Sequence, residues 1–236
     1  MTINILATGT SRGIGAAIAA SFDSSGIRFV GHSTAAAPGR VAADLDQAGA
    51  ASALWTQALE RLDGRVDVLV NNAGIFEATP LDLADDQWLA GWERTMRINL
   101  TASAELTRLA VLHFQQRGGG GRIVNVASRA AYRGDSPAHW HYAASKAGMV
   151  AMTKTVARGY AREAILAFAV CPGFTMTGMA EDYLASRGGE ALLADIPLGR
   201  VADPAEVAAA VRFLALEAPP SMTGAVIDIN GASYVR

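Results

Sequence analysis

A glycine-rich turn between an apolar run and an alanine-rich stretch constrains the fold of this chain more than any other feature. Residues 3–8 are mostly apolar, residues 8–15 read Thr-Gly-Thr-Ser-Arg-Gly-Ile-Gly, and residues 16–25 favour a helix that stops at Gly26. Glycine allows sharp turns and close approach of a ligand to the backbone, and free N–H groups at a helix N-terminus bind phosphate. The order strand, turn, helix therefore favours a nucleotide site. The spacing Gly-x-x-x-Gly-x-Gly also fits an ordinary tight strand-to-helix turn.

Strand-like and helix-like segments alternate along the rest of the chain. Apolar runs predict strands at 28–32, 66–70, 122–127, 166–171 and 225–229, with a brief one at 41–45, and helices are expected at 49–62, 85–116, 140–156 and 203–216. Continuous apolar runs bounded by turn residues are typical of strands buried on both faces. Only about eight residues join the second and third strands, too few for a crossover helix, so we expect a loop there. We predict an α/β fold: a single doubly wound Rossmann-type domain over residues 1–236, with a parallel sheet of about seven strands and helices on both faces.

Composition argues against several classes of partner. The net charge is −2 and no basic tract is present, so we expect neither nucleic acid nor a membrane as a partner. Cys171 is the only cysteine, which excludes an internal disulfide and a cysteine metal cluster, and the four histidines form no convincing ligand set. The first residues lack the features of a signal peptide, and no uncharged apolar run reaches about 18 residues. We therefore expect a cytoplasmic protein without a metal ion.

Tyr142 and Lys146 lie four residues apart in a predicted helix, so both side chains project from the same face. A phenol has a pKa of about 10 and is a poor acid or base at neutral pH. A neighbouring ammonium favours the phenolate and lowers that pKa, which suits the pair to proton transfer. Lysine is rare in this chain, since Lys146 and Lys154 are the only two. Taken alone, the pair also fits two polar residues on a helix surface.

Further polar residues lie at strand ends or inside a predicted helix: Asn71 and Asn72 after 66–70, Ser128 after 122–127, and Asn99 within 85–116. Catalytic and binding groups concentrate at the carboxyl ends of strands in open α/β sheets. The asparagines also fit a strand-end turn and a polar helix residue that bonds a neighbouring carbonyl. His141 is expected to point away from its neighbour Tyr142, and His139 is expected to face solvent on a loop at 129–141.

Together these residues resemble the short-chain dehydrogenase/reductase family over essentially the whole chain. The match rests on features that occur in the family's order: Thr8 to Gly15, Asn71-Asn72-Ala73-Gly74, Asn99, Ser128, Tyr142-x-x-x-Lys146 and Pro172-Gly173. The chain is similar to the single-domain members that include the 3-oxoacyl-carrier-protein reductases. The separation of Ser128 and Tyr142, 14 residues, is one longer than the commonest family spacing, so we expect the intervening loop to differ.

The resemblance implies an NAD(P)(H)-dependent oxidoreductase that interconverts a ketone and a secondary alcohol. It implies four catalytic roles: Tyr142 as general acid or base, Lys146 lowering its pKa and binding the nicotinamide ribose, Ser128 stabilising charge on the substrate oxygen, and Asn99 holding a water for proton relay. The alternatives are a catalytically silent nucleotide-binding regulatory protein and an epimerase or dehydratase on the same fold. The four intact residues argue against the first, and the short C-terminal region argues against the second.

The resemblance also implies the residues that bind the cofactor: Gly9, Ser11, Arg12, Gly13, Ile14, Gly15, His32, Ser33, Thr34, Asp44, Leu45, Asn72, Ala73, Gly74, Tyr142, Lys146, Pro172, Gly173, Thr175 and Thr177. NAD-preferring relatives carry an acidic residue just after the second strand. Residues 31–34, Gly-His-Ser-Thr, hold no carboxylate that would repel a 2′-phosphate, and Arg12 offers a cation. We therefore expect NADP(H), with NAD(H) as the alternative.

We expect the substrate to be a medium-sized, partly hydrophobic ketone or alcohol, a small molecule rather than a polymer. The expected contacts are Ser128, Tyr132, Trp140 and Phe174, with Phe76, Ala130, Met176, Met179, Tyr183 and Leu184 as further pocket residues. Arg129 and Arg133 are near enough in sequence to bind an anionic group. Residues 174–200 are expected to form a substrate lid, and the resemblance implies a homotetramer or a dimer.

Overall fold

Seven parallel strands form one sheet at the centre of the molecule, in a computed structural model that describes residues 2–176 and 189–236. The strands are β1 (Ile3–Ala7), β2 (Ile27–Ser33), β3 (Arg40–Ala42), β4 (Val68–Asn71), β5 (Gly121–Val126), β6 (Ile165–Pro172) and β7 (Val226–Ile229). Their order across the sheet is β3-β2-β1-β4-β5-β6-β7, and every neighbouring pair is parallel. The predicted fold class is confirmed.

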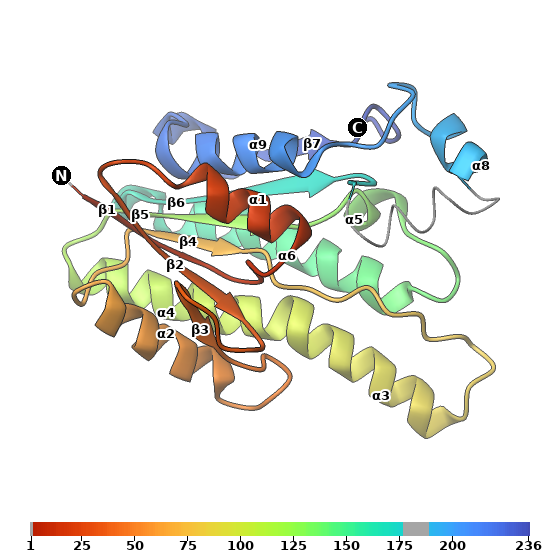
Figure 1. Cartoon of the computed structure of the whole chain (residues 1–236), viewed down its shortest axis with the longest axis horizontal. Helices are drawn as coiled ribbons and strands as arrows, with labels where there is room; N and C mark the ends of the chain where they lie inside the picture. The colour runs from red at the N-terminus through yellow and green to blue at the C-terminus, as the bar shows by residue number, and fades with distance from the viewer. Residues whose placement is uncertain (1, 177–188) are drawn as a thin grey trace.

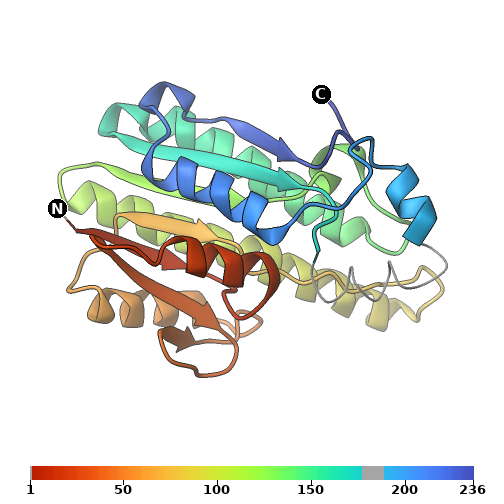
Figure 2. The ribbon, with the colours of Figure 1, turned by 45° about the horizontal axis from the view of Figure 1, so that its top comes forward.

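Helices cover both faces of the sheet, as Figures 1 and 2 show. One face carries α1 (Gly13–Ser21) and α9 (Pro204–Leu216), and the other carries α2 (Ala50–Arg61), α4 (Ala102–Gln116) and α6 (Trp140–Tyr160). α3 (Asp85–Met96) precedes α4. Two short helices, α5 (Ala130–Arg133) and α8 (Gly189–Ala194), lie beyond the carboxyl ends of the strands (Figure 1). Single 3₁₀ turns occur at Ala161–Glu163 and Pro220–Met222. Within the part of the chain that the structure describes, no helix has the length and apolar character needed to cross a membrane.

The sheet is buried on both faces because successive apolar residues of each strand point to opposite sides. Ile5 of β1 belongs to the core cluster that includes Ile18 of α1 and Val207 of α9. The next residue, Leu6, belongs to the opposite cluster with Leu54 of α2 and Leu106 of α4. Burial on both faces explains why the strands are continuous apolar runs.

The connection between β2 and β3 is a loop, as predicted. The chain turns at Gly39, whose φ is +72°, a conformation that favours glycine. The amide of Arg40 donates to the carbonyl of Ala37 (3.1 Å), and the amide of Gly31 donates to the carbonyl of Gly39 (3.0 Å). This tight turn lets β3 lie parallel to β2 without a helix between them.

The helix predicted at 85–116 is interrupted by a π-turn at Arg97–Thr101, which joins α3 to α4. Asn99 lies at its middle, with its side chain fully buried. π-turns inside helices occur frequently at functional sites.

The segment predicted as a loop at 129–141 contains the four-residue helix α5, which is too short to show helical periodicity in the sequence. The start of α9 agrees with the prediction. The Asp203 carboxylate accepts the amide N–H of Ala205 (2.7 Å), and the Glu206 carboxylate accepts the amide N–H of Asp203 (2.7 Å). This capping box fixes the first turn of α9.

Candidate active site

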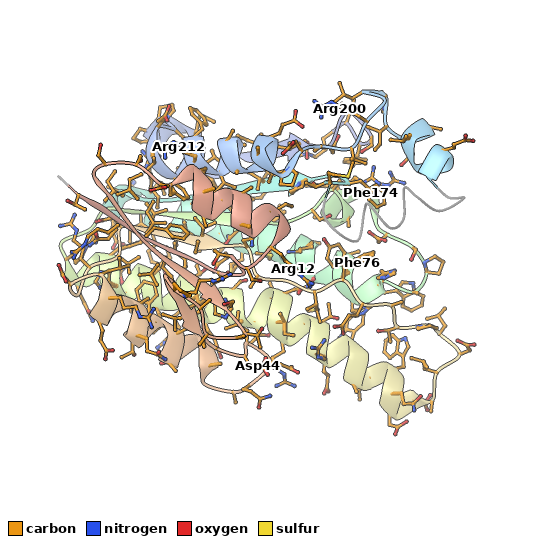
Figure 3. All side chains as sticks on the ribbon, in the orientation of Figure 1. Arg12, Asp44, Phe76, Phe174, Arg200 and Arg212 are labelled. Carbon is orange, nitrogen blue, oxygen red and sulfur yellow. The ribbon has the colours of Figure 1, made fainter. Side chains whose placement is uncertain are left out.

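The predicted site residues meet at one edge of the sheet. The strand order reverses between β1 and β4, the kind of position at which open α/β sheets bind ligands. Site segments follow the carboxyl ends of four strands: the glycine-rich loop after β1, Asn72 after β4, Ser128 after β5 and Gly173 after β6. Figure 3 shows Arg12, Phe76 and Phe174, which come from three different segments, at this end of the molecule.

Steric constraints explain two glycines of the loop at residues 8–15. Gly9 has a φ of +67°, and a Cβ atom there would lie 2.7 Å from the Cα atom of Ala73. A Cβ atom on Gly15 would lie 1.9 Å from the carbonyl oxygen of Gly9. Any side chain at either position would therefore force the loop away from the end of β4.

The first turn of α1 suits the diphosphate of a dinucleotide. Arg12 is the N-cap residue of this helix and forms no side-chain hydrogen bond to the first turn, which also contains no acidic residue. The first N–H groups of a helix have no partner within the helix, and the helix dipole attracts anions there. The residues present thus fit a dinucleotide cofactor, whose diphosphate Gly13, Ile14 and Gly15 would hold through their backbone.

Thr8 and Asn72 fasten the glycine-rich loop to the end of β4. The hydroxyl of Thr8 accepts the amide N–H groups of Asn72 (3.0 Å) and Ala73 (2.9 Å). In return, the Asn72 Nδ2 atom donates to the carbonyls of Thr8 (3.0 Å) and Gly9 (2.9 Å). Asn72 therefore fixes the backbone of the glycine-rich loop, and its contact with the cofactor stays a prediction.

His32 and Ser33, predicted as donors to the cofactor, have other partners in the structure. His32 is only 4% exposed; its Nδ1 atom accepts the amide N–H of Gly9 (3.1 Å), and its Nε2 atom lies 2.9 Å from the carbonyl of Ala43. The hydroxyl of Ser33 donates to a backbone carbonyl two residues further on (2.7 Å). Thr34 is exposed, and its contact with the cofactor stays a prediction.

Two arginines flank the glycine-rich loop, and sequence reasoning missed one of them. Arg12 is exposed on the loop itself. The side chain of Arg40, the first residue of β3, lies over Gly31, because a Cβ atom on this glycine would approach the Arg40 Cγ atom to 3.0 Å and the Thr10 hydroxyl to 2.4 Å. Neither arginine forms an ion pair within the described ranges. The pairing of β3 with β2 brings Arg40 here, and the sequence alone gave no sign of that register.

Asp44 and Leu45, predicted beside the adenine, follow β3 directly. Asp44 is exposed, and its carboxylate accepts the amide N–H of Asp46 (3.1 Å). The side chain of Leu45 is 7% exposed and packs in the core under α2 and α4. Their contact with a nucleotide stays a prediction.

Ser128 and Tyr142 lie close enough for their hydroxyl groups to interact. The hydroxyl of Ser128 also accepts the amide N–H of Ala130 (3.1 Å), which fixes its position at the start of α5. Burial raises the pKa of Tyr142, and the neighbouring Ser128 hydroxyl partly opposes that shift. Tyr142 is therefore a protonated phenol at neutral pH and can act as a proton donor.

Lys146 is buried one helical turn beyond Tyr142, with 4% of its surface exposed. Its Nζ atom donates to the carbonyl of Val126 (2.9 Å), lies 3.7 Å from the Met149 sulfur and lies 5.8 Å from the centre of the Tyr142 ring. Burial lowers the pKa of Lys146 to about 8. The predicted lowering of the Tyr142 pKa by Lys146 is not found, because burial dominates and the ammonium is directed at Val126.

Asn99 holds the segment after β4 through its amide. Its Oδ1 atom accepts the amide N–H of Ile75 (2.8 Å), and its Nδ2 atom donates to the carbonyl of Ile75 (3.0 Å) and to the hydroxyl of Ser145 (3.3 Å). A Cβ atom on Gly74 would lie 3.3 Å from the Asn99 Oδ1 atom and 3.4 Å from the Lys146 Nζ atom. The glycine therefore allows Asn99 and Lys146 to approach the same point from two helices, and the water relay through Asn99 stays a prediction.

An aromatic wall stands beside Tyr142. Phe76 lies edge-to-face with the Tyr142 ring at a centroid distance of 4.8 Å, and the His139 ring stacks on Phe76 at 3.9 Å. His139 is thus half-buried at the edge of the site, whereas the sequence favoured a solvent-facing position. His141 turns away from Tyr142, as expected, and lies 3.0 Å from the hydroxyl of Thr79.

Tyr132, predicted to contact substrate, is engaged elsewhere. Its hydroxyl accepts a hydrogen bond from Arg236 (2.8 Å), and its ring stacks on Tyr234 at 6.1 Å. The sequence could not reveal this contact, because it depends on where the residues after β7 return. Trp140 is 53% exposed and meets the Trp88 ring edge-on at 6.4 Å.

Two arginines follow Ser128 closely in the chain: Arg129 directly precedes α5, and Arg133 is the last residue of α5. The guanidinium of Arg129 lies 4.7 Å above the Phe174 ring, and its side chain is only 10% exposed. Asp195, just after α8, pairs with Arg133 (2.7 Å) and Arg129 (3.4 Å). Burial and the neighbouring charge of Arg133 lower the pKa of Arg129.

The segment after β6 is packed against the end of β7. The carbonyl of Pro172 accepts the amide N–H of Arg129 (2.9 Å), and a Cβ atom on Gly173 would lie 2.8 Å from the Asn230 Cβ atom. Thr175 is buried and donates to the carbonyl of Gly173 (3.2 Å). Thr177, Met179, Tyr183 and Leu184, with the part of the predicted lid at 177–188, lie outside the described residues.

Comparison with known proteins defines the class to which this fold and site belong. A family model described as enoyl-(acyl carrier protein) reductase matches residues 9–232. The chain belongs to the short-chain dehydrogenase/reductase family.

Individual relatives narrow this class. The 3-oxoacyl-[acyl-carrier-protein] reductase FabG of Vibrio cholerae is 35% identical over 241 residues, which cover 98% of this chain and 96% of that protein. The acetoacetyl-CoA reductase of an Acinetobacter species is 38% identical over 201 residues, 83% of this chain and 76% of that protein. The crystal structure of gox2181 matches with a TM-score of 0.88 and 26% identity, covering 98% of this chain and 95% of the other. These similarities support a nicotinamide-dependent oxidoreductase that acts on a ketone or an alcohol.

Proposed function

We propose that this protein prefers NADP(H) and interconverts a ketone and a secondary alcohol, with Tyr142 as general acid in reduction and general base in oxidation. One observation carries the proposal: the Ser128 hydroxyl, where β5 ends, lies next to the Tyr142 phenol, and Lys146 follows one turn further along α6. A phenol, a second hydroxyl and a cation at the carboxyl edge of the sheet suit proton transfer to a substrate oxygen.

The roles of the three side chains follow from their chemistry. When bound, the cofactor supplies a hydride to the carbonyl carbon in reduction or accepts one in oxidation. The hydroxyl of Ser128 stabilises the negative charge that develops on the substrate oxygen, and Tyr142 donates its proton to that oxygen. The ammonium of Lys146, which donates to Val126 and lies 5.8 Å from the Tyr142 ring centre, would stabilise the phenolate that is left by turning toward it. Asn99 keeps Gly74 and Ile75 in place beside Lys146 and would hold the water that restores the proton.

The preference for NADP(H) is supported by the charges around the glycine-rich loop. Arg12 lies on the loop, Arg40 lies over Gly31 next to Thr10, and the first carboxylate after β2 is Asp44, eleven positions beyond the end of the strand. A 2′-phosphate would find two cations here and no repelling carboxylate between Ser33 and Arg40.

We propose a partly hydrophobic ketone with an anionic group as the substrate. Phe76, Trp140 and Phe174 are exposed aromatic side chains, and Phe76 lies against Tyr142. Arg129, which contacts the Phe174 ring, and Arg133 on α5 follow Ser128 in the chain and offer positive charge. The names of both relatives indicate 3-oxoacyl thioesters as their substrates, so acetoacetyl-CoA is the first compound to test.

A homotetramer or dimer is proposed as the working assembly. Leu112 on α4 and Phe213 on α9 are 40% and 37% exposed, and further subunits would cover such apolar side chains. Analytical ultracentrifugation of the purified protein tests this directly.

The proposed activity is tested by replacing Tyr142 with phenylalanine, which removes the proton donor and keeps the ring against Phe76. Wild type should bind NADPH more tightly than NADH and oxidise NADPH with acetoacetyl-CoA or another ketone of a panel. The Y142F variant should bind NADPH as wild type does and lose turnover by about a thousandfold or more. Substantial turnover by Y142F would show that another group donates the proton. Tight nucleotide binding by wild type without turnover of any ketone would favour the regulatory alternative.

A further inference from the structure

His32 joins two segments that are distant in the sequence but adjacent at the nucleotide end of the sheet. Its Nδ1 atom accepts the amide N–H of Gly9 (3.1 Å), and its Nε2 atom lies 2.9 Å from the carbonyl of Ala43. Its own backbone carbonyl accepts the amide N–H of Thr10 (2.8 Å) and the Thr10 hydroxyl (3.2 Å). One residue of β2 therefore contacts both the glycine-rich loop and the segment that leads from β3 to Asp44.

The two ring contacts define the protonation state of His32. An amide N–H can only donate, so the Nδ1 atom that faces Gly9 must carry a lone pair. A carbonyl can only accept, so the Nε2 atom that faces Ala43 must carry the proton. Both contacts are made together only by the neutral ring with its proton on Nε2, and a protonated ring would turn an N–H group toward the N–H group of Gly9.

The surroundings of His32 favour this neutral form. The ring is 4% exposed, and burial lowers its pKa below the ordinary value of 6.5. The charged residues on the neighbouring elements are Arg12 on the loop, Arg40 on β3, Asp44 and Asp46 after β3, and Glu60 and Arg61 on α2. None of these charges contributes to the shift in the pKa of His32. The Arg40 side chain lies over Gly31, and the Asp44 carboxylate accepts a hydrogen bond from the amide of Asp46 in its own turn.

We propose that His32 is a positioning residue for the dinucleotide site: as a neutral imidazole it ties the glycine-rich loop to the β3–α2 segment, and its protonation in acid releases the loop and weakens cofactor binding. The proposal rests on the function proposed above. His32, which the sequence predicted to contact the cofactor, would thus hold the loop that binds the cofactor.

Three substitutions separate the two contacts. The Oδ1 atom of asparagine can take the place of Nδ1, so H32N keeps an acceptor for Gly9 and loses the contact with Ala43. The side chain of glutamine reaches the position of Nε2, so H32Q keeps a donor for Ala43 and loses the contact with Gly9. H32F keeps the size of the ring and loses both contacts.

The test measures NADPH affinity by calorimetry for wild type and the three variants, at neutral pH and at a pH well below 6.5, because burial holds the pKa of His32 below that ordinary value. At neutral pH we expect H32N within about threefold of wild type, and H32Q and H32F about tenfold weaker, which corresponds to about 1.4 kcal/mol and lies within the range for one hydrogen bond. In acid, wild type should weaken by about tenfold. H32N and H32F, which lack the titrating ring, should not show this additional weakening. H32F binding equal to wild type, or equal acid weakening of wild type and H32F, would overturn the proposal.

The free protein gives a second readout that does not depend on cofactor binding. Nitrogen NMR of labelled histidine should show the proton of His32 on Nε2. The protection of the Gly9 amide hydrogen, which is its exchange rate corrected for the intrinsic effect of pH, should be weaker in H32F and in acid than in neutral wild type. If wild type binds no dinucleotide, the proposed function fails, and this protection still decides whether His32 holds the loop. A proton found on Nδ1, or Gly9 protection in folded H32F equal to that in wild type, would refute the role of His32.

Discussion

Replacing Asn72 with alanine should loosen the glycine-rich loop without altering any catalytic side chain. The Nδ2 atom of Asn72 donates to the carbonyls of Thr8 (3.0 Å) and Gly9 (2.9 Å), and alanine removes both hydrogen bonds. Each bond of this kind contributes about 1 kcal/mol to the free energy of unfolding, so the variant should lose about 2 kcal/mol. For a chain of 236 residues this corresponds to a decrease in Tm of about 4–8 °C.

Thermal unfolding followed by circular dichroism, with NADPH titration at room temperature, measures both consequences. NADPH affinity should decrease by up to about tenfold, because the loop must be ordered again when the cofactor binds. Gln115→Ala is the matched control: its amide donates to the carboxylate of Glu163 (2.8 Å) on the exposed surface, and its loss should cost less than about 0.5 kcal/mol. If N72A melts at the same temperature as Q115A and binds NADPH as wild type does, the hydrogen bonds of Asn72 do not hold the loop.

Three further predictions address proton transfer, the packing of the site and the cap of a helix. The rate of ketone reduction should fall as pH rises through about 8, because burial lowers the pKa of Lys146 to about 8 and the ammonium is lost above it; a pH profile of kcat/KM that stays flat there would contradict this role. Gly74→Ala should lower kcat more than it weakens NADPH binding, since its Cβ atom would lie 3.3 Å from Asn99 and 3.4 Å from Lys146; steady-state kinetics beside nucleotide titration separate the two effects. Asp203→Ala should lower the free energy of unfolding by about 1 kcal/mol through loss of the N-cap and leave kcat unchanged, and a denaturant titration that shows no loss would count against the capping box.

The sheet could be predicted because local sequence and burial agree. A strand covered on both faces must be apolar at every position, so runs such as 166–171 are recognisable without any knowledge of their neighbours. The loop between β2 and β3 could be predicted from its length alone. The helix α5 could not, because four residues at Ala130–Arg133 are too few to establish a helical period.

Part of the candidate site could likewise be predicted from the sequence, and part of it could not. Tyr142 and Lys146 are found from their spacing, since both lie on one helix and their separation fixes a common face. The direction of the Lys146 ammonium toward Val126, the stacking of His139 on Phe76 and the position of Arg40 depend on how separate elements meet. Sequence spacing holds no information about such contacts, which is why the raised pKa of Tyr142 and the hydrogen bonds of His32 with Gly9 and Ala43 were not predicted.

The π-turn at Arg97–Thr101 makes the number of residues in this helix as important as their identity. A π-turn holds one residue more than an α-helical turn, and each residue adds about 100° of rotation, so α3 and α4 present different faces to the molecule. α3 accordingly packs against α6, while α4 packs against α2 and the sheet. Deleting a single residue here would leave an uninterrupted helix of nearly the same composition, yet it would rotate Asn99 away from Ile75. The position of Asn99 in the active site therefore depends on one additional residue in the helix. A natural deletion of that residue would displace Asn99 without changing the identity of any site residue.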